Sequence, residues 1–226
     1  MRGVKGLNSE NINNEVHLAG TVDSEPVFSH EVYGEKFLTF VLKVPRLSSI
    51  SDFINITVSE RLIAQDPIQE GDSLEIDGQF RSYNNYSPTG NKLVLTVFAR
   101  DLSKNCSEDT IKNPNYIFLN GFVCKTPVYR ITPFGREITD LLIAVNRAYN
   151  KSDYMPCIAW GRNARFSSDL AVGTNIKIWG RIQSREYQKR ISETQTVTKT
   201  AFEISISKME TEIKEKEKND EQLDII

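Results

Sequence analysis

Cationic and aromatic side chains are interleaved in the segment Ser184–Arg190, which reads Ser-Arg-Glu-Tyr-Gln-Lys-Arg. Arg185, Lys189 and Arg190 surround Tyr187 there. An aromatic ring can stack on the face of a nucleobase, and cations beside it can neutralise phosphates. The segment is therefore a candidate contact for a nucleic acid. An ordinary polar hairpin tip is the alternative.

The segment Asn146–Ser152 repeats this pattern with Arg147, Tyr149 and Lys151. We expect both segments to be loops, because each combines small polar residues with charges and follows an apolar run. Either loop alone would carry little weight. Two of them in the same half of the chain predict one groove for a nucleic acid.

A third candidate is the strand expected over Tyr154–Trp160, in which apolar and other residues alternate. Tyr154 and Trp160 share the face that points away from the core, and Arg162 follows two residues later. The first half of the chain has Phe53 at the position of Tyr154. These rings could instead cover a subunit interface, but their agreement with the two loops favours stacking on bases.

Alternation in the segment Asn175–Ser184 directs its isoleucines to the core and points Lys177, Trp179 and Arg181 outward. A ring between two cations suits a nucleic acid. An outward tryptophan serves a protein interface equally well, so both interpretations stand for Trp179. The matching positions of the first half carry two carboxylates and an amide, in Glu75, Asp77 and Gln79.

The chain contains the same fold twice. Residues 14–46 realign without a gap on residues 115–147, and one residue of slip later extends the match to the glycines near 78 and 180. Glycines and prolines that recur at fixed positions mean that the same turns recur. The coincident residues include Asn14 and Asn115, Gly20 and Gly121, Pro26 and Pro127, Asp52 and Asp153, Gly78 and Gly180, and Ser82 and Ser184.

The two copies differ in charge, although the net charge of the chain is only −2. Residues 14–103 hold 7 Lys and Arg against 13 Asp and Glu, whereas residues 115–209 hold 14 against 7. We expect an N-terminal arm (1–13), an acidic, degenerate first fold (14–103), a linker (104–114), a basic second fold (115–209) and an acidic C-terminal tail (210–226). A basic copy suits a polyanion, so the second fold is the expected binding unit.

Each copy is predicted to have three strands, a short helix or turn, and two more strands. This order is typical of the OB-fold, a five-stranded Greek-key barrel. The fold class is therefore all-β, with two tandem OB-folds. We expect strands over residues 16–22, 37–44, 53–59, 73–82 and 93–101, a helix within 61–69, then strands over 117–123, 138–146, 154–160, 175–184 and 199–209, with a helix or turn near 163–170.

Composition excludes several other classes. The chain is 39% hydrophobic and has no apolar run that could span a membrane, and its start lacks a signal-peptide core. Three scattered cysteines and two histidines have no metal-ligand spacing, and phosphate-loop and nucleophile-elbow motifs are missing. We therefore expect a cytoplasmic protein that is not an enzyme and has no metal, cofactor or disulfide.

The second copy resembles the bacterial single-stranded DNA-binding protein family. The resemblance rests on LNGFVCKTPVYRITPFG, AVNR, YMPCIAWGRNA and IWGRIQSREYQ, which cover most of residues 116–209. The first copy resembles the family more distantly, in LAGTVDSEPVF, DFINITV and IDGQFRSY. By this resemblance, the stacking rings are Tyr154, Trp160 and Tyr187. Only Phe53 is kept in the first copy, where Ser59 and Asn85 stand at the other two positions.

The resemblance also implies partners. Family members with two OB-folds in a chain pair as dimers, which predicts a homodimer. Their acidic tails end in a Pro-Phe pair that recruits replication and repair proteins. This chain ends Asp-Ile-Ile, so the acidic and apolar character is kept without Pro-Phe. Recruitment through the tail and a plain solvated tail are both open.

The leading hypothesis is a protein that binds single-stranded DNA without sequence specificity, mainly through the second fold, in replication, recombination or repair. The alternative is a protein–protein adaptor of a replication or primosome-like complex that uses its OB-folds as docking modules. An RNA-binding OB-fold protein is a third interpretation, which the sequence does not separate from the first.

Overall fold

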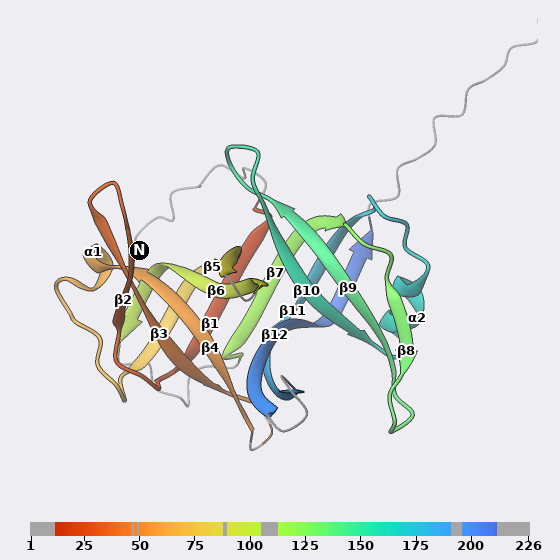
Figure 1. The fold of residues 1–226 in the computed structure, drawn as a ribbon, viewed down its shortest axis with the longest axis horizontal. Helices are drawn as coiled ribbons and strands as arrows, with labels where there is room; N and C mark the ends of the chain where they lie inside the picture. Colours follow the sequence, from red (N-terminus) through yellow and green to blue (C-terminus); the bar gives the residue numbers. More distant parts are fainter. Residues whose placement is uncertain are drawn as a thin grey trace, which may run out of the picture.

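Two β-barrels lie side by side in a computed structural model that describes residues 12–46, 48, 50–87, 90–104, 113–190 and 196–211 (Figure 1). The first barrel contains the strands β1 (Asn14–Val22), β2 (Val27–Val32), β3 (Glu35–Pro45), β4 (Ser51–Ser59), β5 (Ser73–Ser87) and β6 (Gly90–Lys104) and the helix α1 (Glu60–Ile63). The second contains β7 (Asn115–Val123), β8 (Val128–Ile131), β9 (Glu137–Asn146), β10 (Ser152–Trp160), β11 (Asn175–Arg190) and β12 (Thr196–Thr211) and the helix α2 (Arg162–Ser168).

Both barrels have the same strand pairing. The sheet order is β2-β3-β4-β6-β5-β1-β7-β11-β12-β10-β9-β8, and the additional pairs β3–β1 and β7–β9 close each barrel. The pairs β4–β6 and β10–β12 are parallel, while their other neighbours are antiparallel. A closed barrel in which the strand before the helix pairs in parallel with the last strand is the OB-fold. The prediction of two tandem OB-folds is confirmed.

Strands β1 and β7 join the barrels into one sheet. They pair antiparallel from Asn14 opposite Leu119 to Leu18 opposite Asn115. In Figure 1 these two strands cross the middle of the molecule, between the barrels. The buried apolar residues of both barrels form one connected cluster. Each barrel therefore shares a wall with the other.

The recurring asparagines fix β1 to β5 in the first barrel and β7 to β11 in the second. Asn14 donates through Nδ2 to the Phe80 carbonyl at 2.6 Å and accepts from the Phe80 amide at 2.9 Å. Asn115 makes the same two bonds with Ile182, at 2.7 and 2.9 Å. Both asparagines are buried, so each repeats one structural bond pair rather than a binding function.

Gly78 and Gly180 recur because the strands β5 and β6, and β11 and β12, approach too closely there for a side chain. A Cβ on Gly78 would overlap the carbonyl oxygen of Phe98, and one on Gly180 would overlap that of Ser205. The register shifts at both places, between residues 77 and 78 and between 179 and 180. A bulge of this kind bends the strand and helps the sheet to curl into a barrel.

The elements differ from the predicted ones in three ways. Two short strands, β2 and β8, were not predicted, and all of their residues are exposed. The first helix extends only from Glu60 to Ile63 instead of within 61–69. The segment Ser184–Arg190, expected as a loop, continues β11 and pairs with β12 as far as Arg190 opposite Thr196. Most of the expected arm, linker and tail lies outside the described residues.

Candidate nucleic-acid interface

Tyr154 and Trp160 lie on β10 with exposed rings, 44% and 36% accessible. Met155, Cys157 and Ala159 of the same strand are buried in the barrel core. Alternation thus separates core residues from ring-bearing residues along one strand, as the sequence predicts. Two aromatic rings on the same strand face can stack on bases several nucleotides apart.

The two copies differ in the residues at the end of this strand. Arg162 begins α2 directly beyond Trp160 and is exposed. In the first barrel the counterpart of Trp160 is Ser59, which caps α1 by accepting from the Arg61 amide at 3.2 Å. The serine hydroxyl also donates to Glu35 at 2.5 Å. Ser59 therefore has a capping role in place of a stacking role.

The loop over residues 147–151 holds Tyr149 away from the protein surface. Tyr149 is 94% exposed, and it and Asn150 have φ angles of 60° and 53°. The loop is closed by a bond from the Arg147 amide to the Lys151 carbonyl at 2.8 Å. Non-glycine residues rarely adopt left-handed backbone, and they often do so at functional sites. Arg147, Tyr149 and Lys151 are therefore brought together at one edge of the barrel.

Asp153 is a buried carboxylate that binds arginines from both barrels. Its Oδ1 accepts from Arg147 at 3.2 Å and from the Ser82 amide at 2.8 Å, and its Oδ2 accepts from Arg81 at 2.9 Å. The Tyr154 amide in turn donates to the Ser82 hydroxyl at 2.7 Å. Strand β10 of the second barrel is thus attached to β5 of the first, next to Tyr154.

Asp52 of the first barrel makes the equivalent contact with the second barrel. It accepts two bonds from Arg46, at 2.8 and 2.5 Å, and one from the Ser184 amide at 2.8 Å. The Phe53 amide donates to the Ser184 hydroxyl at 2.9 Å. Phe53 itself is 41% exposed on β4. The recurrence of aspartate and serine is therefore explained by two contacts between the barrels.

Trp179 lies in a different environment from Tyr154 and Trp160. Its ring packs against Phe118 of β7, with centroids 5.2 Å apart, and Lys208 Nζ of β12 lies 4.4 Å from its centre. Lys177 and Arg181 flank it on β11 and are half-buried. The structure therefore places Lys177, Trp179 and Arg181 on the wall of the sheet next to β7.

The remaining predicted residues lie at the far end of β11. Arg185 is exposed, and its Nε is 4.0 Å from Glu203. Tyr187, Lys189 and Arg190 belong to the part of the strand that pairs with β12. Their side chains lie outside the described residues. This end of β11 forms a long hairpin with β12 rather than a loop.

Arg81, Tyr83 and His30 were not among the binding residues predicted from the sequence. They line a cavity in the first barrel together with Arg147. A signal was available, because Arg81 aligns with Gln183 of the second copy and is therefore a cation gained in the acidic copy. The cavity was missed because its walls come from four strands of the first barrel, β2, β4, β5 and β6, and from Arg147 in a loop of the second.

The described part of the chain offers no metal centre, reactive cysteine or membrane-spanning helix. No group of three or more His, Cys, Asp and Glu side chains there could hold a metal ion. Burial raises the pKa of the Cys157 thiol well above its ordinary range, which leaves it protonated and unsuited to nucleophilic attack. No described helix has the length and apolar character that crossing a membrane requires.

Comparison with known proteins identifies the second barrel. Residues 114–211 match the single-strand binding protein family. This match covers the second barrel, and the first barrel lies outside it. A single-stranded DNA-binding protein of Clostridium tetani is 32% identical over 91 residues, which are 37% of this chain and 63% of that protein. Single-stranded DNA-binding protein A of Bacillus subtilis is 29% identical over 96 residues, or 39% and 56%.

The fold of the whole chain is similar to a solved family structure. The wild-type single-stranded DNA binding protein from Thermus aquaticus superimposes with a TM-score of 0.68 at 18% identity, over 90% of this chain and 94% of that chain. At this identity the likeness concerns the fold alone. This chain spans between half and two thirds of the length of the curated relatives that it matches first.

Proposed function

We propose that the protein binds single-stranded DNA without sequence specificity, mainly through its second barrel, and takes part in replication, recombination or repair without catalysing a reaction. The observation that carries this proposal is the pair of exposed rings on β10, Tyr154 and Trp160, in the barrel that matches the family. The names of the relatives from Clostridium tetani and Bacillus subtilis support the choice of ligand.

Two physical terms contribute to binding. Stacking contributes about 1–3 kcal/mol per base on a suitable ring. Cations around the rings, at Arg147, Lys151 and Arg162, attract phosphates regardless of sequence, and this attraction weakens as salt rises. The excess of cations in residues 115–209 acts in the same direction over the whole barrel. Neither term requires a metal or a cofactor.

The test is titration of a fluorescent oligo(dT) with the full chain and with the Trp160→Ala variant, at two salt concentrations. We expect the substitution to weaken binding at least about tenfold, which lies within the range of about 1–3 kcal/mol that one stacked base contributes. Phe134→Ala is the matched control, because Phe134 is an exposed ring of the same barrel on the turn between β8 and β9. Unchanged affinity of Trp160→Ala would contradict the assignment of this ring.

Competition distinguishes the ligand classes. Duplex DNA should not displace oligo(dT), whereas an oligo(U) of equal length that displaces it fully would favour an RNA-binding protein. The absence of any salt-dependent binding by the full chain would favour the adaptor hypothesis, because an apolar protein interface responds little to salt.

We also propose that two chains pair as a homodimer through the outer face of β5, β1, β7 and β11. One half of this face is acidic, where His17 binds Glu75 at 3.2 Å and Asp77 at 2.8 Å. The other half holds Trp179 and Phe118 among the cations Lys177, Arg181 and Lys208. A twofold axis would bring the acidic half of one chain onto the basic half of the other.

Light scattering tests the pairing. A homodimer has twice the 25.7 kDa mass of the chain. We expect Trp179→Glu to give the monomer mass and Trp160→Ala to keep the dimer mass. A wild-type chain that remains monomeric at micromolar concentration would contradict the proposal.

A further inference from the structure

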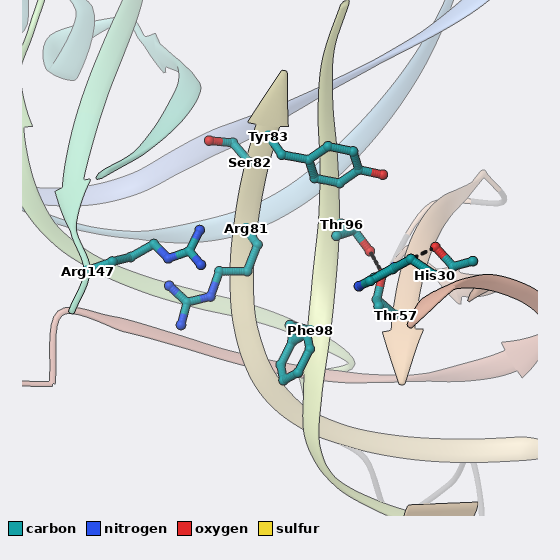
Figure 2. A pocket seen from close by; sticks show the side chains of 9 residues that line it. His30, Thr57, Arg81, Ser82, Tyr83, Thr96, Phe98 and Arg147 are labelled. Carbon is teal, nitrogen blue, oxygen red and sulfur yellow. Dashed lines mark hydrogen bonds between the residues drawn. The ribbon is translucent and has the colours of Figure 1, made fainter. Parts of the chain in front are cut away.

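A cavity of about 560 Å³ opens on the first barrel at its boundary with the second (Figure 2). It is lined by Tyr83, Arg81, His30 and Phe98 of the first barrel and by Arg147 of the second. Its volume lies within the range of roughly 300–1,000 Å³ that small-ligand pockets occupy. The cavity is thus large enough for a ligand of nucleotide size, although it lies on the copy whose overall charge is acidic.

Aromatic rings form two of its walls. Tyr83 of β5 is 52% exposed. His30 of β2 stacks on Phe37 with ring centroids 4.9 Å apart, and Phe37 packs in turn against Phe98 at 5.7 Å. This contact holds the His30 ring against a buried support. A flat ligand can therefore lie between rings that are already positioned.

Hydroxyl groups line the wall between the rings. Thr57 and Thr96 are buried and bonded to each other at 2.8 Å, and Thr96 also donates to the Asn55 carbonyl at 3.1 Å. Each hydroxyl retains acceptor capacity. Such groups can bond the polar edge of a base, which an entirely apolar wall could not do.

The boundary of the cavity carries excess positive charge. Arg81 and Arg147 share the single buried carboxylate of Asp153, and Figure 2 shows their guanidinium groups side by side. Arg100 approaches the same group, donating to Gln79 Oε1 at 2.7 Å, and Gln79 Oε1 also bonds Arg81. Two guanidinium groups thus share one carboxylate, and a third reaches them through the Gln79 amide oxygen. A phosphate would reduce that excess.

The equivalent boundary on the other side lacks this excess. Asp52 binds one arginine, Arg46, and the position of Arg81 is taken by Gln183, which donates to Glu203 at 2.6 Å. The duplication thus provides an internal comparison. The extra cation, Arg81, belongs to the boundary at which the cavity opens.

We propose that this cavity is a second nucleotide subsite, in which a base lies between Tyr83 and His30 and its phosphate lies against Arg81 and Arg147. The subsite continues the interface on β10, because the Tyr154 amide is bonded to Ser82 in the cavity wall at 2.7 Å. A strand that stacks on Tyr154 would therefore pass from the second barrel into the first. This inference rests on the proposed function.

Two oligo(dT) lengths test the subsite in the full chain. One is about 10 nucleotides, which a single OB-fold can cover, and the other about 30, which exceeds one fold. We expect Tyr83→Ala to weaken binding of the long oligonucleotide at least about fivefold, as the loss of a stacked base requires, and to leave the short one unchanged. Tyr33→Ala is the matched control, because Tyr33 is a fully exposed tyrosine of the same barrel outside the cavity lining.

A second variant tests the phosphate contact. Arg81→Gln reproduces the residue of the other copy, and it should make the log–log salt slope for the long oligonucleotide shallower by about 0.7, the value for one single-strand phosphate. A Tyr83→Ala variant that binds both lengths like wild type would overturn the subsite, as would equal losses for both lengths. Failure of the wild type to bind either length would instead reject the proposed function itself.

Discussion

Asp153 joins the two barrels and holds two arginines of the proposed nucleic-acid interface. Its carboxylate is fully buried, yet its partners Arg81 and Arg147 are partly exposed and belong to different barrels. A buried charge is tolerated only when it is paired and hydrogen-bonded. The arginines are therefore held in place by the residue that neutralises one of them.

We expect Asp153→Asn to lower the free energy of unfolding by about 2–3 kcal/mol, because it removes the negative partner of two guanidinium groups at a buried position. Chemical denaturation monitored by circular dichroism measures this change. Asp140→Asn is the matched control, because Asp140 pairs with Arg130 at the surface, where an ion pair contributes no more than about 1 kcal/mol. Equal losses for the two variants would contradict the role of Asp153.

The sequence was informative about these residues only in part. Comparison of the copies singled out Asp52, Asp153, Ser82 and Ser184, because each recurs at a fixed shift. It could not show that each aspartate bonds the serine amide of the other barrel, since that contact depends on how the barrels associate. Trp179 was ambiguous for the same reason. Alternation predicts that a side chain points outward, but not what lies outside.

At the scale of elements, the bulges on β5 and β11 allow each barrel to close. Gly180 faces the backbone of β12 so closely that a methyl group would overlap a carbonyl oxygen. We expect Gly180→Ala to destabilise the protein by about 1–3 kcal/mol, the usual cost of overpacking. Thermal unfolding measures it, with the neighbouring Arg181→Ala as control. A Gly180→Ala variant as stable as wild type would show that the bulge can relax.

Elements with a strong alternation were predictable, and those without it were not. The core strands and the OB-fold order follow from apolar residues at every second position. Strands β2 and β8 have no buried residue, so no apolar face marked them in the sequence. The far end of the hairpin of β11 and β12 contains polar residues such as Lys189 and Thr196, whose backbones continue the strand pairing. Its composition therefore suggested a loop.

At the scale of the whole molecule, the two barrels share one sheet and one connected apolar cluster. We therefore expect a single cooperative unfolding transition in calorimetry, because neither barrel keeps its wall when the other unfolds. The destabilisation caused by Gly180→Ala should lower the midpoint of this entire transition. A scan with two transitions, only one of them shifted, would show that the barrels unfold independently.

The opposite charges of the copies have a role at this scale as well. The excess of acidic residues in the first barrel disfavours a phosphate backbone, whereas the proposed subsite at Arg81 would attract it. The charge distribution can therefore restrict a bound strand to one path across the molecule. This distribution was readable from the sequence by counting charges in each copy.

The pairing of β1 with β7 occurs within one chain. In an assembly of separate subunits, an equivalent contact would be lost on dilution, since its population depends on protein concentration. Here the covalent connection maintains a high effective concentration of each barrel for the other. The spacing between the barrels is thus independent of how many copies of the protein a cell contains, and even a single molecule carries a complete pair.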